Sequence, residues 1–152
     1  MRKNSRDITA LYLIAASEDG PTKIGISRDP DHRLKELQSG HARPLHVFHA
    51  TWLVERKYAK KAEAWLHKEL ADKRQSGEWF SVAISAAREL VTQCVVCQIG
   101  VKYLYIKTFA ATDGEILGDN APRHGALATK KQIERLAPLM SAARRKEFGL
   151  DP

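Results

Sequence analysis

Two short apolar segments separated by a turn constrain the fold of this chain more than any other feature. Residues 10–16 form an apolar run that ends at Ser17-Glu18-Asp19-Gly20-Pro21, a sequence typical of a turn. Residues 22–27 form a second run, rich in β-branched residues. A connection this short cannot hold the crossover that parallel strands need. The two segments are therefore predicted to pair as an antiparallel hairpin.

A helix is predicted directly after this hairpin. Asp29 is a suitable N-cap, Pro30 suits the first helical position, and Gly40 suits the position just past the end. Leu34 and Leu37 would give this helix a narrow apolar face.

The order of the remaining elements predicts the fold class. A third strand is expected over 45–53, and a second helix over 58–71, where apolar residues recur at helical spacing. A short extended segment over 77–82 precedes a third helix over 84–96. The pattern is α+β: a small three-stranded antiparallel sheet flanked by helices, with a β-β-α-β-α core.

The character of the chain changes near residue 99. We predict one domain over 8–98 and a basic C-terminal extension over 99–152. The extension would contain a short strand at 103–106, a linker at 112–129 and a basic helix at 130–148.

Charge and cysteine content restrict the partners and the location. The formal net charge is +7 and the pI is about 9.5, and a basic surface attracts polyanions, most commonly nucleic acid. The chain has neither an apolar run long enough for a membrane span nor a secretory signal, so we expect a cytoplasmic protein that binds no membrane. Cys94 and Cys97 form a single Cys-x-x-Cys. Without a second ligand pair for zinc, we expect two buried thiols.

Several short motifs, in a fixed order, resemble the phage and bacterial branch of the GIY-YIG nuclease superfamily over about residues 9–83. The matching segments are Leu11-Tyr12-Leu13-Ile14, Lys23-Ile24-Gly25-Ile26-Ser27, Arg33, Leu34-x-x-Leu37-Gln38-Ser39-Gly40, Glu63-x-x-x-His67 and Gly77-Glu78-Trp79-Phe80.

The resemblance implies a small domain that cuts phosphodiester bonds with one divalent metal ion, Mg²⁺ or Mn²⁺. Tyr12 matches the tyrosine that orients or deprotonates the attacking water, and Arg33 matches the catalytic arginine. Glu63 matches the metal ligand, and Gly25 matches the glycine of the second motif. Lys23 stands where that motif usually has tyrosine.

The chain also departs from the family pattern. Ala10 replaces the glycine two residues before Tyr12, the second tyrosine is absent, and Trp79-Phe80 occupies the region where relatives have an asparagine. These departures leave the general base open between Tyr12 and Lys23.

The residue types suit this chemistry. Mg²⁺ needs only one or two carboxylates beside water and substrate phosphate, so Glu63 would suffice. Arg33 would offer a donor fork to a phosphate oxygen. A phenol with a pKa near 10 is a poor base unless a charge such as Lys23 lowers that pKa. His67, one turn after Glu63, would contact a phosphate or metal-bound water, or hold Glu63 in one rotamer.

Four basic residues are predicted to contact nucleic acid through its phosphates: Lys35, His41, Lys60 and Lys61. Trp79 and Phe80 are read as core residues in preference to base-stacking platforms.

The first hypothesis is a metal-dependent endonuclease that hydrolyses phosphodiester bonds in DNA. The alternatives are a catalytically decayed nucleic-acid-binding module and a protein-interaction domain on the same fold. The choice between DNA and RNA, the biological pathway and the oligomeric state stay open at this point.

Overall fold

The structure is a computed structural model, and it describes residues 8–100 and 104–110. Within these residues one antiparallel sheet has the strand order β4-β5-β2-β1-β3-β6. The elements in chain order are β1 (Thr9–Ala15), β2 (Thr22–Ser27), α1 (Pro30–Gln38), β3 (His46–Leu53), α2 (Arg56–Glu69), β4 (Arg74–Ser76), β5 (Trp79–Phe80), α3 (Ile84–Cys94) and β6 (Leu104–Ala110). A short 3₁₀ turn (Ala71–Lys73) follows α2, and a π-helical turn (Val95–Ile99) follows α3.

The predicted hairpin is confirmed. β1 and β2 pair antiparallel, with Tyr12 opposite Gly25 and Leu13 opposite Ile24. β3 pairs with the other side of β1, so β1 lies in the middle of the sheet. The predicted β-β-α-β-α order is therefore present in the described residues.

The capping residues place α1 where the sequence predicts it. The side chain of Asp29 accepts a hydrogen bond from the backbone N–H of His32 at 3.1 Å, and Pro30 is the first helical residue. Leu34 and Leu37 pack on the sheet, as their spacing indicates.

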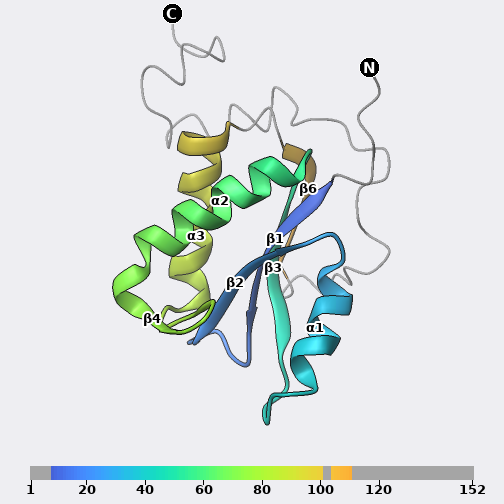
Figure 1. The fold of residues 1–152 in the computed structure, drawn as a ribbon, viewed down its shortest axis with the longest axis vertical. Coiled ribbons are helices and arrows are strands. Elements are labelled where there is room, and N and C mark those ends of the chain that lie inside the picture. The colour runs from blue at the N-terminus through green and yellow to red at the C-terminus, as the bar shows by residue number, and fades with distance from the viewer. Residues whose placement is uncertain (1–7, 101–103, 111–152) are drawn as a thin grey trace, which may run out of the picture.

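The helices form layers on the two faces of the sheet. Figure 1 shows α1 on one side of the strands and α2 with α3 on the other. Side chains alternate along β1 accordingly. Leu11 and Leu13 face the core under α2 and α3, whereas Tyr12 and Ile14 face the smaller cluster under α1.

The prediction of a three-stranded sheet was wrong, because β4, β5 and β6 join the three expected strands. β4 and β5 have 3 and 2 residues, too few for a recognisable alternation of apolar and polar side chains. β6 begins beyond the π-helical turn and pairs with β3, a contact between distant segments that local pattern does not report.

The prediction of two buried thiols was wrong for one of them: Cys94 is buried and Cys97 is exposed. The chain passes from α-helix to a π-helical turn between them, closed by a bond from Gly100 N–H to the Val95 carbonyl at 2.7 Å. The wider turn rotates Cys97 off the face that Cys94 occupies.

The linker and basic helix predicted at 112–129 and 130–148 lie outside the described residues. Among those that are described, none of the helices combines the length and apolar character that crossing a membrane requires.

Candidate functional site

An open pocket of about 530 Å³ lies where two layers of the fold reach the same edge of the sheet. β5 pairs only with Thr22 and Lys23 of β2, so it stops before the second half of that strand. Next to the unpaired half of β2, side chains from β1, β2, α1, α2 and the turn between β4 and β5 surround one space. The lining residues are Tyr12, Ile26, Arg33, Arg56, Lys60, Glu63 and Glu78.

Tyr12 reaches this pocket because Gly25 has no side chain. The two residues are cross-strand partners, and a Cβ built on Gly25 would lie 2.6 Å from Cζ of Tyr12. Only glycine leaves room for the ring to cross β2 at this position. The ring itself is almost completely buried, with 1% of the residue exposed.

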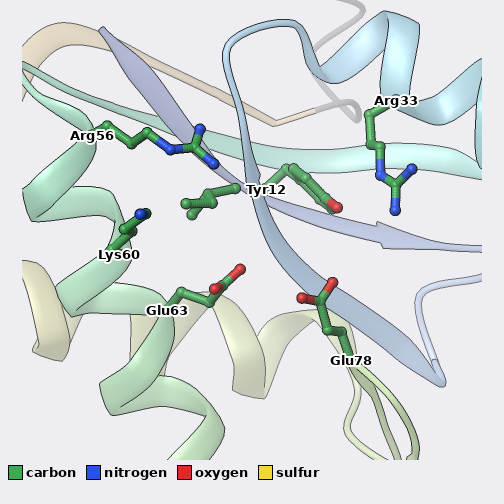
Figure 2. A pocket seen from close by; sticks show the side chains of 7 residues that line it. Tyr12, Arg33, Arg56, Lys60, Glu63 and Glu78 are labelled. Atoms are coloured by element: carbon green, nitrogen blue, oxygen red, sulfur yellow. The ribbon is translucent and has the colours of Figure 1, made fainter. Parts of the chain in front are cut away.

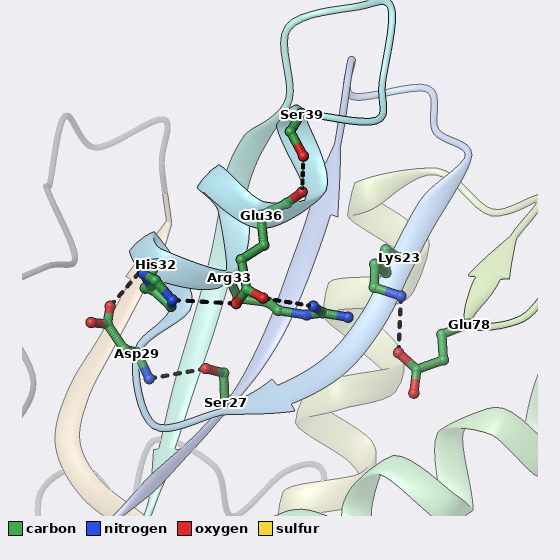
Figure 3. Close-up of polar contacts among 8 residues, drawn as sticks. All are labelled: Lys23, Ser27, Asp29, His32, Arg33, Glu36, Ser39 and Glu78. Atoms are coloured by element: carbon green, nitrogen blue, oxygen red, sulfur yellow. Dashed lines mark hydrogen bonds and ion pairs between the residues drawn. The ribbon is translucent and has the colours of Figure 1, made fainter.

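Arg33 approaches Tyr12 from α1. Its guanidinium makes a side-chain hydrogen bond with the Tyr12 hydroxyl, which raises the pKa of Arg33. Because a guanidinium has no acceptor, Arg33 is the donor in this bond. Arg33 also forms an ion pair with Glu36 at 3.7 Å (Figure 3). The arginine is thus held at the pocket by two partners and stays charged.

Three side chains of α2 enter the pocket together. Arg56, Lys60 and Glu63 are spaced i, i+4 and i+7, which places them on one face of the helix. Figure 2 shows the Glu63 carboxylate facing the same space as Glu78, below the Tyr12 ring in that view.

Glu78 joins the pocket from the short segment between β4 and β5. Its Oε2 accepts a hydrogen bond from Nζ of Lys23 at 2.9 Å (Figure 3). Lys23 is almost buried, with 6% exposed, and its ammonium lies 5.8 Å from the Trp79 ring centroid. Lys23 therefore acts as the counter-ion of Glu78 beside the pocket and does not line it.

Burial raises the pKa of two of the predicted site residues, Tyr12 and Glu63. It raises the pKa of Tyr12 above its usual value, and the Arg33 hydrogen bond opposes this only in part. Tyr12 is consequently a neutral phenol near pH 7. Burial also raises the pKa of Glu63, and the negative charge of Glu78 adds to that shift. His67, Arg56 and Lys23 act in the opposite direction.

His67 has a backbone partner. Its Nε2 donates to the carbonyl oxygen of Ile24 at 2.9 Å, and its ring lies 5.0 Å from the Phe80 ring. This bond ties α2 to the edge of β2 next to Glu63. His67 itself is not among the residues that line the pocket.

The remaining residues that were predicted to contact nucleic acid or to form the core lie outside the pocket lining, except Lys60. Lys35 and Lys61 are exposed, and neither lines the pocket, unlike Lys60. The His41 ring stacks on Trp79 with 5.6 Å between centroids. Phe80 is fully buried in the core beneath α2, and Trp79 is partly buried.

Sequence reasoning assigned no role to Arg56 or Glu78. Arg56 was missed because α2 begins two residues earlier than its apolar pattern indicates, and its N-cap, Glu55, makes no side-chain capping bond. Glu78 was missed because, within Gly77-Glu78-Trp79-Phe80, only the two aromatic residues were assigned a role. The available signal was an acidic side chain directly after Gly77, a residue typical of turns.

Comparison with known proteins corrects the family prediction. Residues 9–95 match the family model described as the T5orf172 domain, a stretch that runs from β1 into the turn after α3. No curated protein and no solved structure is significantly similar to the chain. The GIY-YIG prediction was wrong, because the matching family is a different one. This family is nuclease-like, which agrees at a coarse level with an endonuclease and with nucleic acid as the partner. More than half of the chain matches that model, and the protein belongs to the T5orf172 domain family.

Proposed function

We propose that this protein is a metal-dependent endonuclease that hydrolyses phosphodiester bonds in DNA. One observation carries the proposal: Tyr12, Arg33, Glu63 and Glu78, from four separate segments, line a single open pocket. Phosphodiester hydrolysis needs an aligned water and compensation of charge on the phosphoryl oxygens. An arginine, a hydroxyl and two carboxylates around one space are suited to both tasks.

The donor set fits one Mg²⁺ or Mn²⁺ ion. Two carboxylates face the pocket, and the charge of Glu78 contributes to raising the pKa of Glu63. A divalent cation would relieve this repulsion between like charges. No group of three or more potential metal-ligating side chains occurs in the described part of the chain. Mg²⁺ does not need one, since it retains water and takes one or two carboxylates with substrate phosphate.

Glu63 would hold the ion, which when bound polarises the phosphate and stabilises the leaving oxygen. Arg33 would donate to a non-bridging phosphate oxygen. Tyr12, kept neutral by burial, would orient the attacking water through its hydroxyl. It does not serve as a tyrosinate base in this scheme.

The proton of the attacking water requires an acceptor. Lys23 is occupied by its ion pair with Glu78. Oε2 of Glu78 accepts the hydrogen bond from Lys23, so the other carboxylate oxygen is left to accept a proton. We assign it to take the proton of the attacking water. As this proton leaves, the water oxygen bonds to phosphorus and the bond from phosphorus to the leaving oxygen breaks. His67 is a positioning residue that fixes α2, and therefore Glu63, against β2.

The proposal is tested by cleavage with and without Mg²⁺ or Mn²⁺ on single-stranded, duplex and branched DNA and on RNA. Glu63→Gln should lower the metal-dependent rate by at least about a hundredfold, the order found for losing one key electrostatic group. Binding to DNA should persist. Glu69→Gln, an exposed change on the same helix, is the matched control and should cut like the wild type.

Equal cutting by Glu63→Gln and wild type would refute Glu63 as the metal ligand. If the wild type binds these nucleic acids but cuts none of them with either metal, the chain is a nucleic-acid-binding module without catalysis.

A further inference from the structure

Three cationic side chains line the pocket, whereas the proposed reaction uses only one of them, Arg33. Arg33 lines it from α1, and Arg56 and Lys60 line it from α2. Figure 2 places Arg56 and Lys60 on one side of the pocket and Arg33 on the opposite side, with Tyr12 and the two carboxylates between them. The cations thus form two separate groups.

Arg56 and Lys60 share their face of α2 with one carboxylate, Glu63. Burial raises the pKa of Glu63, and the charge of Arg56 opposes that rise. Within the part of the chain that the structure describes, neither forms an ion pair, whereas the neighbouring Lys57 pairs with Glu55 at 3.4 Å. Both residues are exposed at the mouth of the pocket. Two like charges one helical turn apart repel each other, and Glu63 supplies one negative charge beside these two positive ones. Their arrangement suits an anionic ligand supplied from outside.

The edge of β2 supplies a further donor to the pocket. The N–H of Ile24 donates to the Glu78 carbonyl at 3.1 Å, so it points away from β1. Strand alternation directs the N–H of Ile26 the same way, and β5 has already ended there. Ile26 lines the pocket. A backbone N–H and two cations are the groups that commonly bind phosphate in nucleic-acid complexes.

The pocket is also large for a single phosphate. Its volume of about 530 Å³ lies within the range of about 300–1,000 Å³ that accommodates entire small ligands.

We propose that Arg56 and Lys60 form a subsite for the phosphate adjacent to the one that is cut. The site would then take a polynucleotide strand running from the α2 side of the pocket to the α1 side. An isolated phosphodiester would fill only the part between Arg33 and Glu63. This inference rests on the proposed function, and it names the substrate class as a strand with at least two successive phosphates.

The first measurement compares two substrates: a DNA oligonucleotide and bis(p-nitrophenyl) phosphate, a diester without neighbouring phosphates. For each protein, kcat/KM for DNA is divided by kcat/KM for the small diester. In the double variant Arg56→Ala/Lys60→Ala this ratio should fall at least about tenfold, because the lost contacts serve only the longer substrate. Lys68→Ala/Lys73→Ala removes the same charge at exposed positions outside the pocket. In that control the ratio should stay within about twofold of wild type. An equal fall for both substrates in the first pair would overturn the subsite.

The second measurement does not depend on cleavage. Fluorescence anisotropy without metal gives the salt dependence of binding to a single-stranded oligonucleotide. Arg56→Ala/Lys60→Ala should reduce the slope of log K against log[salt] by at least about 0.7, the contribution of one phosphate contact on a single strand. Thermal melting of each variant checks that it is folded.

The two measurements separate the possible failures. A wild type that cuts neither substrate refutes the proposed function, and the anisotropy slopes then still decide on the subsite. Slopes that are equal in the two double variants would refute the subsite whether or not the protein cuts DNA.

Discussion

At Gly25 the absence of a side chain lets the Tyr12 ring cross β2 toward the pocket. The hydroxyl then meets Arg33, which comes from the layer on the same face as Tyr12. Both residues were predicted as site residues from sequence motifs. The burial that keeps Tyr12 neutral, and the ion pair that occupies Lys23, depend on neighbours far away in the chain.

Gly25→Ala should destabilise the protein by about 1–3 kcal/mol, the usual cost of overpacking, since the new Cβ would overlap the Tyr12 ring. In a Tyr12→Leu background the same change should cost at least about 1 kcal/mol less, because the shorter side chain leaves space. Urea denaturation of the four proteins measures this coupling. Additive effects would show that the two side chains do not compete for space.

The helices and strands differ in how much their own sequence specifies. α1 has Asp29, Pro30 and an apolar pair at helical spacing, so its limits follow from local chemistry. α2 lacks a side-chain cap, and its first turn was missed together with Arg56. β5 is a strand only because β2 and β4 pair with it. Its shortness leaves the β2 edge open and so permits the pocket.

β6 provides a test at this scale, since its backbone pairs with β3 from Leu53 to His49. A chain ending at residue 103 should be less stable than one ending at residue 110 by about 2 kcal/mol or more, because each lost backbone hydrogen bond contributes about 1 kcal/mol. Exposing the β3 edge should also promote association. Thermal melting and light scattering of the two chains measure both effects. Equal melting temperatures would show that β6 does not stabilise the sheet.

The whole molecule combines a basic surface with a layered core that contains a buried polar residue. The formal charge is +7, yet the pocket places two carboxylates among its cations. Within β3, His49 is 6% exposed and bonds through Nε2 to Thr51 Oγ1 at 2.7 Å. Burial, with the charge of Arg88, lowers the pKa of His49 to about 4.

Stability should therefore fall with acidification between the unfolded and folded pKa values of His49. The unfolded chain binds a proton near pH 6.5, whereas the folded one resists protonation until about pH 4. The contribution of His49 to the free energy of unfolding is complete above pH 6.5 and is lost as the pH falls toward 4. In total it amounts to about 3 kcal/mol. His49→Gln should flatten this dependence while retaining a group that bonds to Thr51. Unfolding free energies measured from pH 7 to 4 check it, and parallel curves for the two proteins would contradict it.

Local chemistry was enough to establish the hairpin, the limits of α1 and the α+β order of elements, because turns, caps and short periodic patterns act within a few residues. Tyr12, Arg33 and Glu63 were predicted as site residues from the motif resemblance, and all three line the pocket. The match to the T5orf172 domain family replaced the GIY-YIG relationship that the short motifs had suggested. Only the tertiary structure revealed the six-stranded order of the described sheet, the Lys23–Glu78 ion pair, the backbone bond of His67, and the presence of Arg56 and Glu78 beside Tyr12. These features join segments distant in sequence, and their energies depend on burial and charge that arise when the layers pack.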